Sequence, residues 1–456
     1  MSPRSRRARD SAGGGPKTAT VRPAADIGVR ESRLRREPNF VRRFWALLGP
    51  GLITGASDDD PSGIATYAVA GASLGYSTLW TALVTLPMMA VTQFLCAKIG
   101  LVTGRGLGEV LRLRYPRYVV VPLVGALVIA NCINAGADIG AIGASINLLV
   151  PIPIVALVVP IGLIILALQI WGSYRLISTI FKWLAFALLA YIGSAFFAKP
   201  DWFALLRGTF IPTISFNASY LTTLVAILGT TISPYMFFWQ ARMEVEEDID
   251  FGRHTLRERK GTTDAEVRYV AWDVSWGMLF SQVVMYFIIL SCAATLHASG
   301  HTHVQTAADV AKALVPIAGK GAEILLAAGM IGAGFLAVPI LTASSGFALS
   351  GALGWKAGLS DHPERAPQFY GIIVASTLVG IAINFLGISP VAALYWTAVI
   401  NGVLAPFLLV FIVLLSNDKK VMGERTNPPL INAVGWATTA AMGAAAVALF
   451  VFWGKS

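Results

Sequence analysis

The sequence is short of charge and of cysteine. Asp, Glu, Lys and Arg make up only 13% of the 456 residues, whereas hydrophobic residues make up 55%. So little charge excludes a soluble domain of ordinary composition. The three cysteines, Cys96, Cys132 and Cys292, have no paired spacing and fall inside long apolar runs. They are therefore predicted to be buried small hydrophobes rather than a disulfide framework or a set of metal ligands.

Long apolar runs dominate the rest of the chain. A helix needs about 20 mainly apolar residues to cross a bilayer, and the sequence offers about eleven such segments. Transmembrane strands would be shorter and would alternate strictly, so the runs predict helices. The segments begin near Phe44, Thr78, Tyr118, Pro151, Ser178, Tyr220, Val267, Gly319, Pro367, Pro390 and Pro429.

The net charge of +10 is distributed unevenly across this membrane protein. If the N-terminus lies inside and the helices are threaded in turn, all but five of the 35 Lys and Arg residues fall on the inner side. This asymmetry is the positive-inside rule, and it explains the charge without nucleic acid. It predicts a multi-pass protein of the plasma or inner membrane with a cytoplasmic N-terminus. The five cations predicted outside are Lys199, Arg207, Lys312, Lys320 and Lys455.

Two of the predicted spans are interrupted by polar residues at mid-depth. The first carries "SDDDPSG" at residues 57–63, and the sixth carries "GTTISPY" at residues 229–235. Pro61 and Pro234 alone could simply kink two packed helices. An ionised Asp at the bilayer centre costs at least ~2.5 kcal/mol, however, and persists mainly where it has a partner or a function. The cluster of aspartates is therefore predicted to be a cation site.

The two breaks lie five spans apart, which is typical of a transporter built from inverted repeats. The predicted fold is an all-α membrane protein with a LeuT-like inverted repeat of two five-helix units and an eleventh helix. The expected boundaries are a disordered basic cytoplasmic tail at 1–43, a first repeat at 44–198 and a second repeat at 199–415. A loop and the last helix follow at 416–456.

The residues around the first break resemble those of the NRAMP divalent-metal transporters. In that family Gly-Pro opens helix 1 and an Asp-Pro-Gly-Asn motif follows, as Gly49-Pro50 and Asp60-Pro61-Ser62-Gly63 do here. The resemblance covers residues 44 to about 450 and implies a transporter of divalent cations rather than an enzyme. Further similar segments are "QFLCAKIGLVTGRGLGEVLRLRYP" (93–116), "IGASINLL" (142–149), "CAATLHASG" (292–300) and "LLAAGMIGAG" (325–334).

Departures from the family pattern bear on the choice of ion. The family's helix 6 carries Met-Pro-His, where this sequence has Ser233-Pro234-Tyr235, and the motif Asn is Gly63. The soft thioether ligand and the amide ligand are therefore missing. Asp138 aligns with an acidic residue that the family uses in proton movement. The pattern is similar to the NRAMP-related magnesium transporters, a divergent branch.

The site expected from these residues is lined by oxygen alone. Without sulfur it loses its preference for soft or borderline ions, and small residues should leave a wide cavity suited to a hydrated Mg²⁺. Mn²⁺ is expected to be carried as well. The candidate metal ligands are the carboxylates of Asp60 and Asp59, backbone carbonyls near Ser57 and Thr230, and the hydroxyls of Ser62 and Ser233, with Gly63 leaving space.

The expected mechanism is alternating access that brings the cation into the cytoplasm. Tyr235 does not titrate near neutral pH as His does, so transport without protons is the simpler reading. Two charges moving inward gain ~4.6 kcal/mol per 100 mV of membrane potential. Asp138 leaves proton coupling open. Tyr235 and Asp138 are thus the candidates for a gate or proton path, and a proton-coupled Mn²⁺/Fe²⁺ transporter of the parent type is the main alternative.

Other functions fit the sequence less well. An amino-acid transporter of the same fold would present little acid at the break, and "DDDP" would repel the substrate carboxylate. An intramembrane aspartyl protease using Asp60 and Asp138 would need a Gly-x-Gly-Asp element, which neither residue has. Apart from the transported cation and the lipid bilayer, the sequence indicates no cofactor, obligate protein partner or nucleic acid.

Two further groups of titratable residues stand outside the breaks. His297, His301 and His303 lie in a predicted outer loop, without Cys or carboxylate at ligand spacing, which favours a solvated loop over a metal site. Asp273 lies near the inner end of the seventh span and is expected to pair with Arg268 or to line the exit.

Overall fold

The computed structural model describes residues 50–171, 189–359 and 361–452, and these ranges contain helices and no strands. The helices are α3 (Pro50–Asp58), α4 (Pro61–Leu74), η2 (Gly75–Thr78), α5 (Trp80–Thr103), α6 (Leu107–Arg114), α7 (Arg117–Leu149), α8 (Ile154–Trp171), α10 (Ala190–Phe197), α11 (Trp202–Phe210), α12 (Ala218–Thr231), α13 (Pro234–Asp250), α14 (Leu256–Arg259), α15 (Asp264–Cys292), η4 (Ala293–His297), α16 (Ala307–Lys312), α17 (Val315–Ala318), η5 (Gly319–Gly321), α18 (Ala322–Leu353), α19 (Pro367–Ile383), η6 (Asn384–Leu386), α20 (Pro390–Asn417), α21 (Lys419–Met422) and α22 (Pro429–Phe452).

Within the described ranges, nine helical segments are long and apolar enough to cross a membrane. They confirm a multi-pass protein and lie where the apolar runs predicted them. Three of them begin at the predicted prolines, Pro367, Pro390 and Pro429, because proline suits the first turn of a helix. The predicted first span is divided into the short helices α3 and α4. The span predicted near Ser178 begins outside the described residues.

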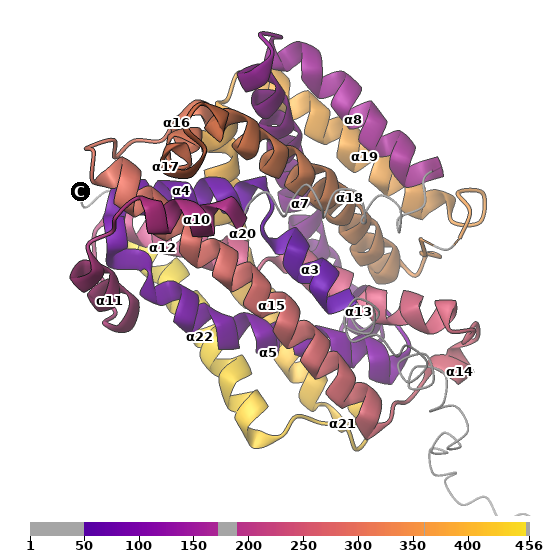
Figure 1. Cartoon of the computed structure of the whole chain (residues 1–456). Helices are drawn as coiled ribbons and strands as arrows, with labels where there is room; N and C mark the ends of the chain where they lie inside the picture. The colour runs from indigo at the N-terminus through magenta and orange to yellow at the C-terminus, as the bar shows by residue number, and fades with distance from the viewer. Residues whose placement is uncertain (1–49, 172–188, 360, 453–456) are drawn as a thin grey trace, which may run out of the picture.

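The long helices α7 and α18 pack against each other through the middle of the molecule (Figure 1). The first broken helix lies beside them, with α3 against α15 and α4 against α15, α20 and α12. The second broken helix packs through α12 on α20 and through α13 on α5 and α18. Both breaks are therefore surrounded by other helices rather than by lipid.

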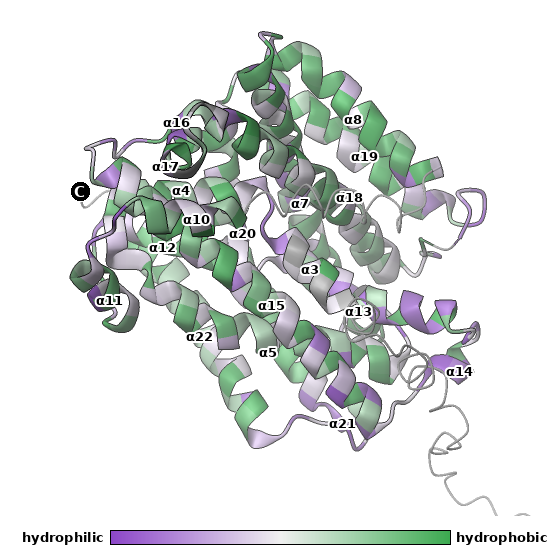
Figure 2. Cartoon of the chain, viewed as in Figure 1, coloured by the Kyte–Doolittle hydropathy of each residue, from purple (hydrophilic) through white to green (hydrophobic). Residues whose placement is uncertain are grey.

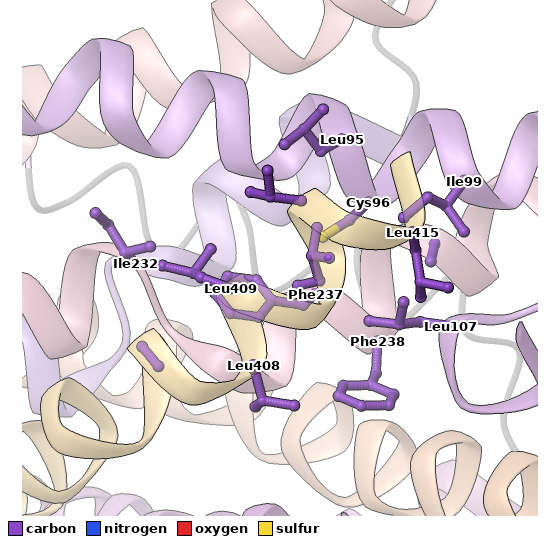
Figure 3. Close-up of a cluster of buried hydrophobic side chains, with 14 of the residues drawn as sticks. Leu95, Cys96, Ile99, Leu107, Ile232, Phe237, Phe238, Leu408, Leu409 and Leu415 are labelled. Carbon is purple, nitrogen blue, oxygen red and sulfur yellow. The ribbon is translucent and has the colours of Figure 1, made fainter. Parts of the chain in front are cut away.

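The largest hydrophobic core lies beside the second break, where α5, α6, α12, α13 and α20 meet. Ile232, which stands in the break itself, is fully buried in this cluster. Such packing holds the irregular backbone in place from its apolar side. Figure 3 shows the cluster with Leu95, Cys96, Ile99, Leu107, Ile232, Phe237, Phe238, Leu408, Leu409 and Leu415 labelled.

Hydropathy separates the surface of the molecule into regions. In Figure 2 green residues cover helices such as α8, α19 and α22, whereas purple residues gather around α14 and α21 at one end. Large apolar side chains such as Leu163, Ile164 and Phe407 are exposed on the helices. This is the surface expected of a protein that faces hydrocarbon. Cys96, Cys132 and Cys292 are free and buried, as predicted.

Glycines bring the broken helices close to their neighbours. A Cβ atom at Gly55 of α3 would clash with the backbone of Gly277 on α15. A Cβ atom at Gly229 of α12 would clash with Ala398 and Gly402 on α20. Small residues at such crossings let helix backbones touch, which is how helices associate in a membrane.

Candidate functional site

Asp60 stands at the break between α3 and α4 and caps the second helix. Its backbone is extended (φ −68°, ψ 170°), and Pro61 follows at the first helical position. Its Oδ1 accepts hydrogen bonds from the Gly63 backbone N–H at 2.7 Å and from the Ser62 hydroxyl at 2.8 Å. The predicted interruption is thus an N-cap, in which the carboxylate satisfies amides that the helix leaves unpaired.

The second oxygen of Asp60 is held more loosely. Asn134 on α7 donates from Nδ2 at 3.4 Å, and the Tyr235 hydroxyl on α13 donates at 3.5 Å. Thr397 on α20 lies 2.9 Å from Asn134 Oδ1 and orients that amide. Because both bonds are at the long end of the range, Oδ2 is the oxygen best placed to bind a cation.

Tyr235 links the two broken helices. Besides approaching Asp60, its hydroxyl donates to the Ser57 carbonyl at 3.2 Å. That carbonyl belongs to the last turn of α3, where helix carbonyls lack partners within the helix. The Ser57 hydroxyl instead donates to Ile53 of its own helix at 2.6 Å. The Ser57 carbonyl is thus directed to Tyr235 on α13, whereas the Ser57 hydroxyl is directed back into α3.

Gly63 does not open a wide cavity in this conformation. A Cβ atom at this position would lie 3.2 Å from Thr230 Oγ1 and 3.3 Å from the Asp58 carbonyl oxygen. The Thr230 side chain also lies beside the phenol of Tyr67. In this conformation these neighbours take up the space beside Gly63, and the expectation of a wide site for a hydrated ion stays a prediction.

The Ser233 hydroxyl donates its hydrogen bond to α12. Its Oγ donates to the carbonyls of Gly229 at 2.9 Å and Thr230 at 2.7 Å. These are carbonyls of the last turn of α12, which the helix itself leaves unpaired. The hydroxyl is buried at the break and keeps its lone pairs, whereas the Thr230 carbonyl already accepts one bond.

Asp58 and Asp59 face a different neighbour from Asp60. The hydroxyl of Ser281 on α15 lies 2.6 Å from Asp58 Oδ2 and 3.4 Å from Asp59 Oδ1. Both aspartates are buried, and one hydroxyl proton serves two carboxylates. Asp59 therefore shares none of the hydrogen-bond donors that contact Asp60. A buried pair of this kind needs a proton or a cation for neutrality.

Asp138 lies on α7 about one turn from Asn134 and is fully buried. Its electrostatic neighbours are Asp60 and the backbone amide of Ser62. In the described part of the chain no side chain donates a hydrogen bond to it. Asp138 therefore lies near Asp60, and its role in a gate or proton path stays a prediction.

The assembled site is closed from solvent. The candidate ligand residues and Tyr235 are each at most 2% exposed. Across the described ranges no three His, Cys, Asp or Glu side chains gather into one potential metal-binding set. Asp60 is instead surrounded by hydroxyl, amide and phenol groups. The arrangement can hold one divalent cation on a carboxylate and neutral oxygens, with water completing its shell.

Sequence reasoning did not predict three of the contacts around the site. Asn134 and Ser281 reach the aspartates from α7 and α15, and Asp273 accepts a hydrogen bond from the Gly51 amide at 2.6 Å. Asp273 thus holds the start of α3, a contact that the expected alternatives, pairing with Arg268 or lining the exit, did not include. The spacing of Asn134 and Asp138 on one helix face was the signal that could have identified the first of them.

His297, His301 and His303 do not gather into one set of metal ligands in the described residues. His297 Nδ1 lies 2.8 Å from the Ala72 carbonyl, and His301 Nδ1 lies 3.1 Å from the Ser299 hydroxyl. The exposed loop was predicted correctly, and His297 additionally ties the end of η4 to α4.

Known proteins resemble this chain over most of its length. The divalent metal cation transporter MntH of Brucella suis is 27% identical over 417 residues, covering 90% of this chain and 89% of that protein. MntH of Klebsiella pneumoniae is 28% identical over 398 residues, covering 87% and 91%. These relatives are transporters.

Solved structures show the fold. The manganese transporter of Eremococcus coleocola superposes with a TM-score of 0.71 at 19% identity, covering 90% of this chain and 87% of that one. Mhp1, a nucleobase-cation-symport-1 family transporter, gives a TM-score of 0.52 at 12% identity, covering 90% and 94%. The fold is LeuT-like, as predicted. The sequence model described as natural resistance-associated macrophage protein-like matches residues 51–452, so the chain belongs to the Nramp family.

Proposed function

We propose that this protein transports divalent metal cations, Mg²⁺ and also Mn²⁺, across the plasma membrane into the cytoplasm by alternating access. The observation that carries the proposal is the buried Asp60 carboxylate, placed at a helix break with one oxygen loosely held. A buried carboxylate in a membrane protein costs free energy unless a cation or a function compensates it. Divalent metal transport by the MntH relatives supports the same cargo.

Oxygen chemistry supports Mg²⁺ as a substrate. The groups that contact Asp60 are a backbone amide, a hydroxyl, a side-chain amide and a phenol. Ser233 stands where the family keeps its thioether, so the soft ligand that favours Mn²⁺ over Mg²⁺ is replaced by oxygen. Mg²⁺ keeps several waters and needs few protein ligands. These features support the proposal that the chain belongs with the magnesium-transporting branch that its motifs resemble.

Alternating access requires the closed site to open towards the cytoplasm. A cavity of about 710 Å³ lies on the predicted cytoplasmic side, lined in part by Phe238, Arg242, Glu246 and Phe347. Tyr235, which contacts Asp60, and Trp239 are both buried on α13, the helix that also carries the cavity residues Phe238 and Arg242. We propose that this cavity is the exit and that two repeats, 44–198 and 199–415, move against each other around the breaks.

A second candidate is proton-coupled Mn²⁺/Fe²⁺ transport of the parent Nramp type. Asp138 favours it, because this buried carboxylate faces Asp60 and has no side-chain donor in the described part of the chain. A carboxylate so placed can carry a proton when the metal binds. Tyr235 favours the uncoupled mechanism, since a phenol does not exchange protons near neutral pH.

Uptake into proteoliposomes tests the proposal. The wild-type protein should take up both Mg²⁺ and Mn²⁺ when the inside of the vesicle is negative. The Asp60→Asn substitution should lower the uptake of each ion at least ten-fold. Asn keeps the N-cap oxygen for Gly63 but removes the charge, so the fold should survive. Equal uptake by wild type and Asp60→Asn would remove Asp60 from the pathway.

Recording internal pH in the same vesicles separates the two candidates. Uncoupled transport leaves the internal pH unchanged while metal enters. Acidification that follows Mn²⁺ uptake, and that disappears in Asp138→Asn, would establish the proton-coupled candidate instead. Mn²⁺ uptake with no Mg²⁺ uptake would reject the magnesium assignment and leave divalent-metal transport standing.

A further inference from the structure

A groove separate from the metal site lies between α5, α15 and the start of α22. Its volume is about 360 Å³. The walls include Ala90 and Phe94 of α5, Val267 and Ala271 of α15, and Ile431 of α22. The distribution of Lys and Arg predicts that these helix ends lie on the cytoplasmic side. The groove therefore offers an apolar slot at the edge of the membrane.

A buried lysine stands at one end of the groove. Lys98 is 4% exposed, and its Nζ donates to Asn427 Oδ1 at 2.9 Å, an amide that also bonds Ser416. The Phe94 ring lies 5.9 Å from Nζ. Among the described residues, no carboxylate forms a salt bridge with Lys98. A buried cation with unused donors is costly unless an anion joins it.

A second cation lines the same end. Arg425 pairs with the exposed Asp264, donates to the Thr262 carbonyl and lies within electrostatic reach of Lys98. Glu424 also lines the groove and is exposed to solvent, where water screens its charge. The buried end of the groove is therefore dominated by Lys98 and Arg425.

The groove has the length and position of a lipid site. Lys98 lies eight positions after Ala90 on α5, or about 12 Å along the helix. Trp272 and Trp276 stack on the exposed face of α15 with ring centroids 6.4 Å apart. Exposed tryptophans mark the interface between water and hydrocarbon. The cations thus lie at headgroup level and the apolar walls reach into the acyl region.

We propose that this groove binds one anionic glycerophospholipid. Its phosphate contacts Lys98 and Arg425, and one acyl chain lies between α5 and α15. Basic pockets between transmembrane helices on the cytoplasmic side are suited to anionic headgroups. A soluble anion would leave the apolar walls unused, whereas a phospholipid matches both ends of the groove.

A lipid in this groove would support the helix that holds α3. The groove residues Val267 and Ala271 follow one face of α15, spaced by four residues. Asp273, Gly277 and Ser281 follow a neighbouring face, about 100° further round the helix, where they contact α3 and the aspartates. Lipid binding therefore braces α15 on a face next to its contact with α3 and should stabilise the closed cytoplasmic half.

Thermal unfolding of the full-length protein in detergent tests the proposal. Phosphatidylglycerol and phosphatidylcholine are added at equal concentration, and the midpoint of unfolding is measured. Phosphatidylglycerol should raise the midpoint several degrees more than phosphatidylcholine, because a ligand stabilises the state that binds it. Lys98→Gln, which keeps a donor for Asn427, should lose at least half of this difference.

Two further variants and one anion control sharpen the test. Lys420→Gln removes the same charge from an exposed position on the same side and should keep the full effect. Ala271→Phe fills the slot, leaves both cations in place and should lose the effect, so it carries the test if Lys98→Gln does not fold. Equal effects of the two lipids, a full effect in Lys98→Gln, or the same shift with inorganic phosphate alone would overturn the proposal.

Discussion

Asp60 combines two roles that use different oxygens. Oδ1 accepts two short hydrogen bonds and fixes the first turn of α4, whereas Oδ2 accepts two long ones from α7 and α13. The structural role therefore does not use up the oxygen that a cation needs. A cation on Oδ2 would compete only with donors on other helices, which can move when those helices move.

Ser233 is the residue whose size and chemistry set the ion preference in this proposal. Ser233→Met should lower Mg²⁺ uptake several-fold and keep or improve Mn²⁺ and Cd²⁺ uptake. The thioether is a ligand for borderline and soft ions and offers nothing to a hydrated hard ion. The measurement is uptake of each metal into vesicles at equal membrane potential.

Ser233→Leu is the matched control for that substitution. Leu has a similar volume, also loses the bond to the Thr230 carbonyl, and has no ligand atom. It should reduce the uptake of all three ions alike. If Met and Leu give the same ion profile, Ser233 acts through packing alone and the selectivity argument fails.

The residues of the site were predictable where they belong to the two helix breaks or to the family resemblance, as Tyr235 does. Asp60, Ser62 and Gly63 belong to one motif, and the structure places them in one cap. Asn134 is separated from Asp60 by 74 residues and Ser281 from Asp58 by 223 residues. Such contacts depend on how helices cross, which local patterns do not specify.

At the scale of helices, α3 is the element best placed to open the site. It is short, and its N-terminal end is fixed by Asp273 and its middle by the contact of Gly55 with Gly277. Tyr235 fixes its last turn through the Ser57 carbonyl. These contacts all belong to the closed state, so breaking one should favour the open state.

Gly55→Ala should shift the protein towards a cytoplasm-open state. The added methyl meets the Gly277 backbone, and overpacking of this kind costs about 1–3 kcal/mol, enough to move a conformational equilibrium. Ser57→Cys, introduced as a reporter at a position that is 1% exposed, should then react with maleimide from the cytoplasmic side several-fold faster.

The control for this experiment is Gly125→Ala on α7. A Cβ atom at Gly125 meets nothing within 4 Å, so labelling of the reporter should not change. Labelling that rises equally in both variants would indicate general loosening. No rise with Gly55→Ala would mean that α3 is not the moving element.

The whole fold was predictable because hydrophobic length and two helix breaks are strong signals. The described spans begin at or within a few residues of the predicted positions, and both interruptions are real. The crossings at Gly55 and Gly229 were not foreseen, because a glycine in an apolar run does not reveal its partner. The two-repeat boundaries at 44–198 and 199–415 remain a prediction.

Orientation in the membrane is predicted from charge and is the last property to test. The connection that contains α14 should be cytoplasmic, and the loop after η4 should be outside, because Lys and Arg gather on the cytoplasmic side. Arg257→Cys and His301→Cys place single reporters at exposed positions of these two segments. The native cysteines are buried and should give little background.

In intact cells a membrane-impermeant maleimide should label His301→Cys and not Arg257→Cys, which should react only after permeabilisation. This result would place the 710 Å³ cavity, lined in part by Arg242 and Arg259, on the cytoplasmic side and make it an exit. The opposite labelling pattern would invert the protein. The cavity would then be an entrance, and the proposed direction of uptake would be wrong although the metal site itself would stand.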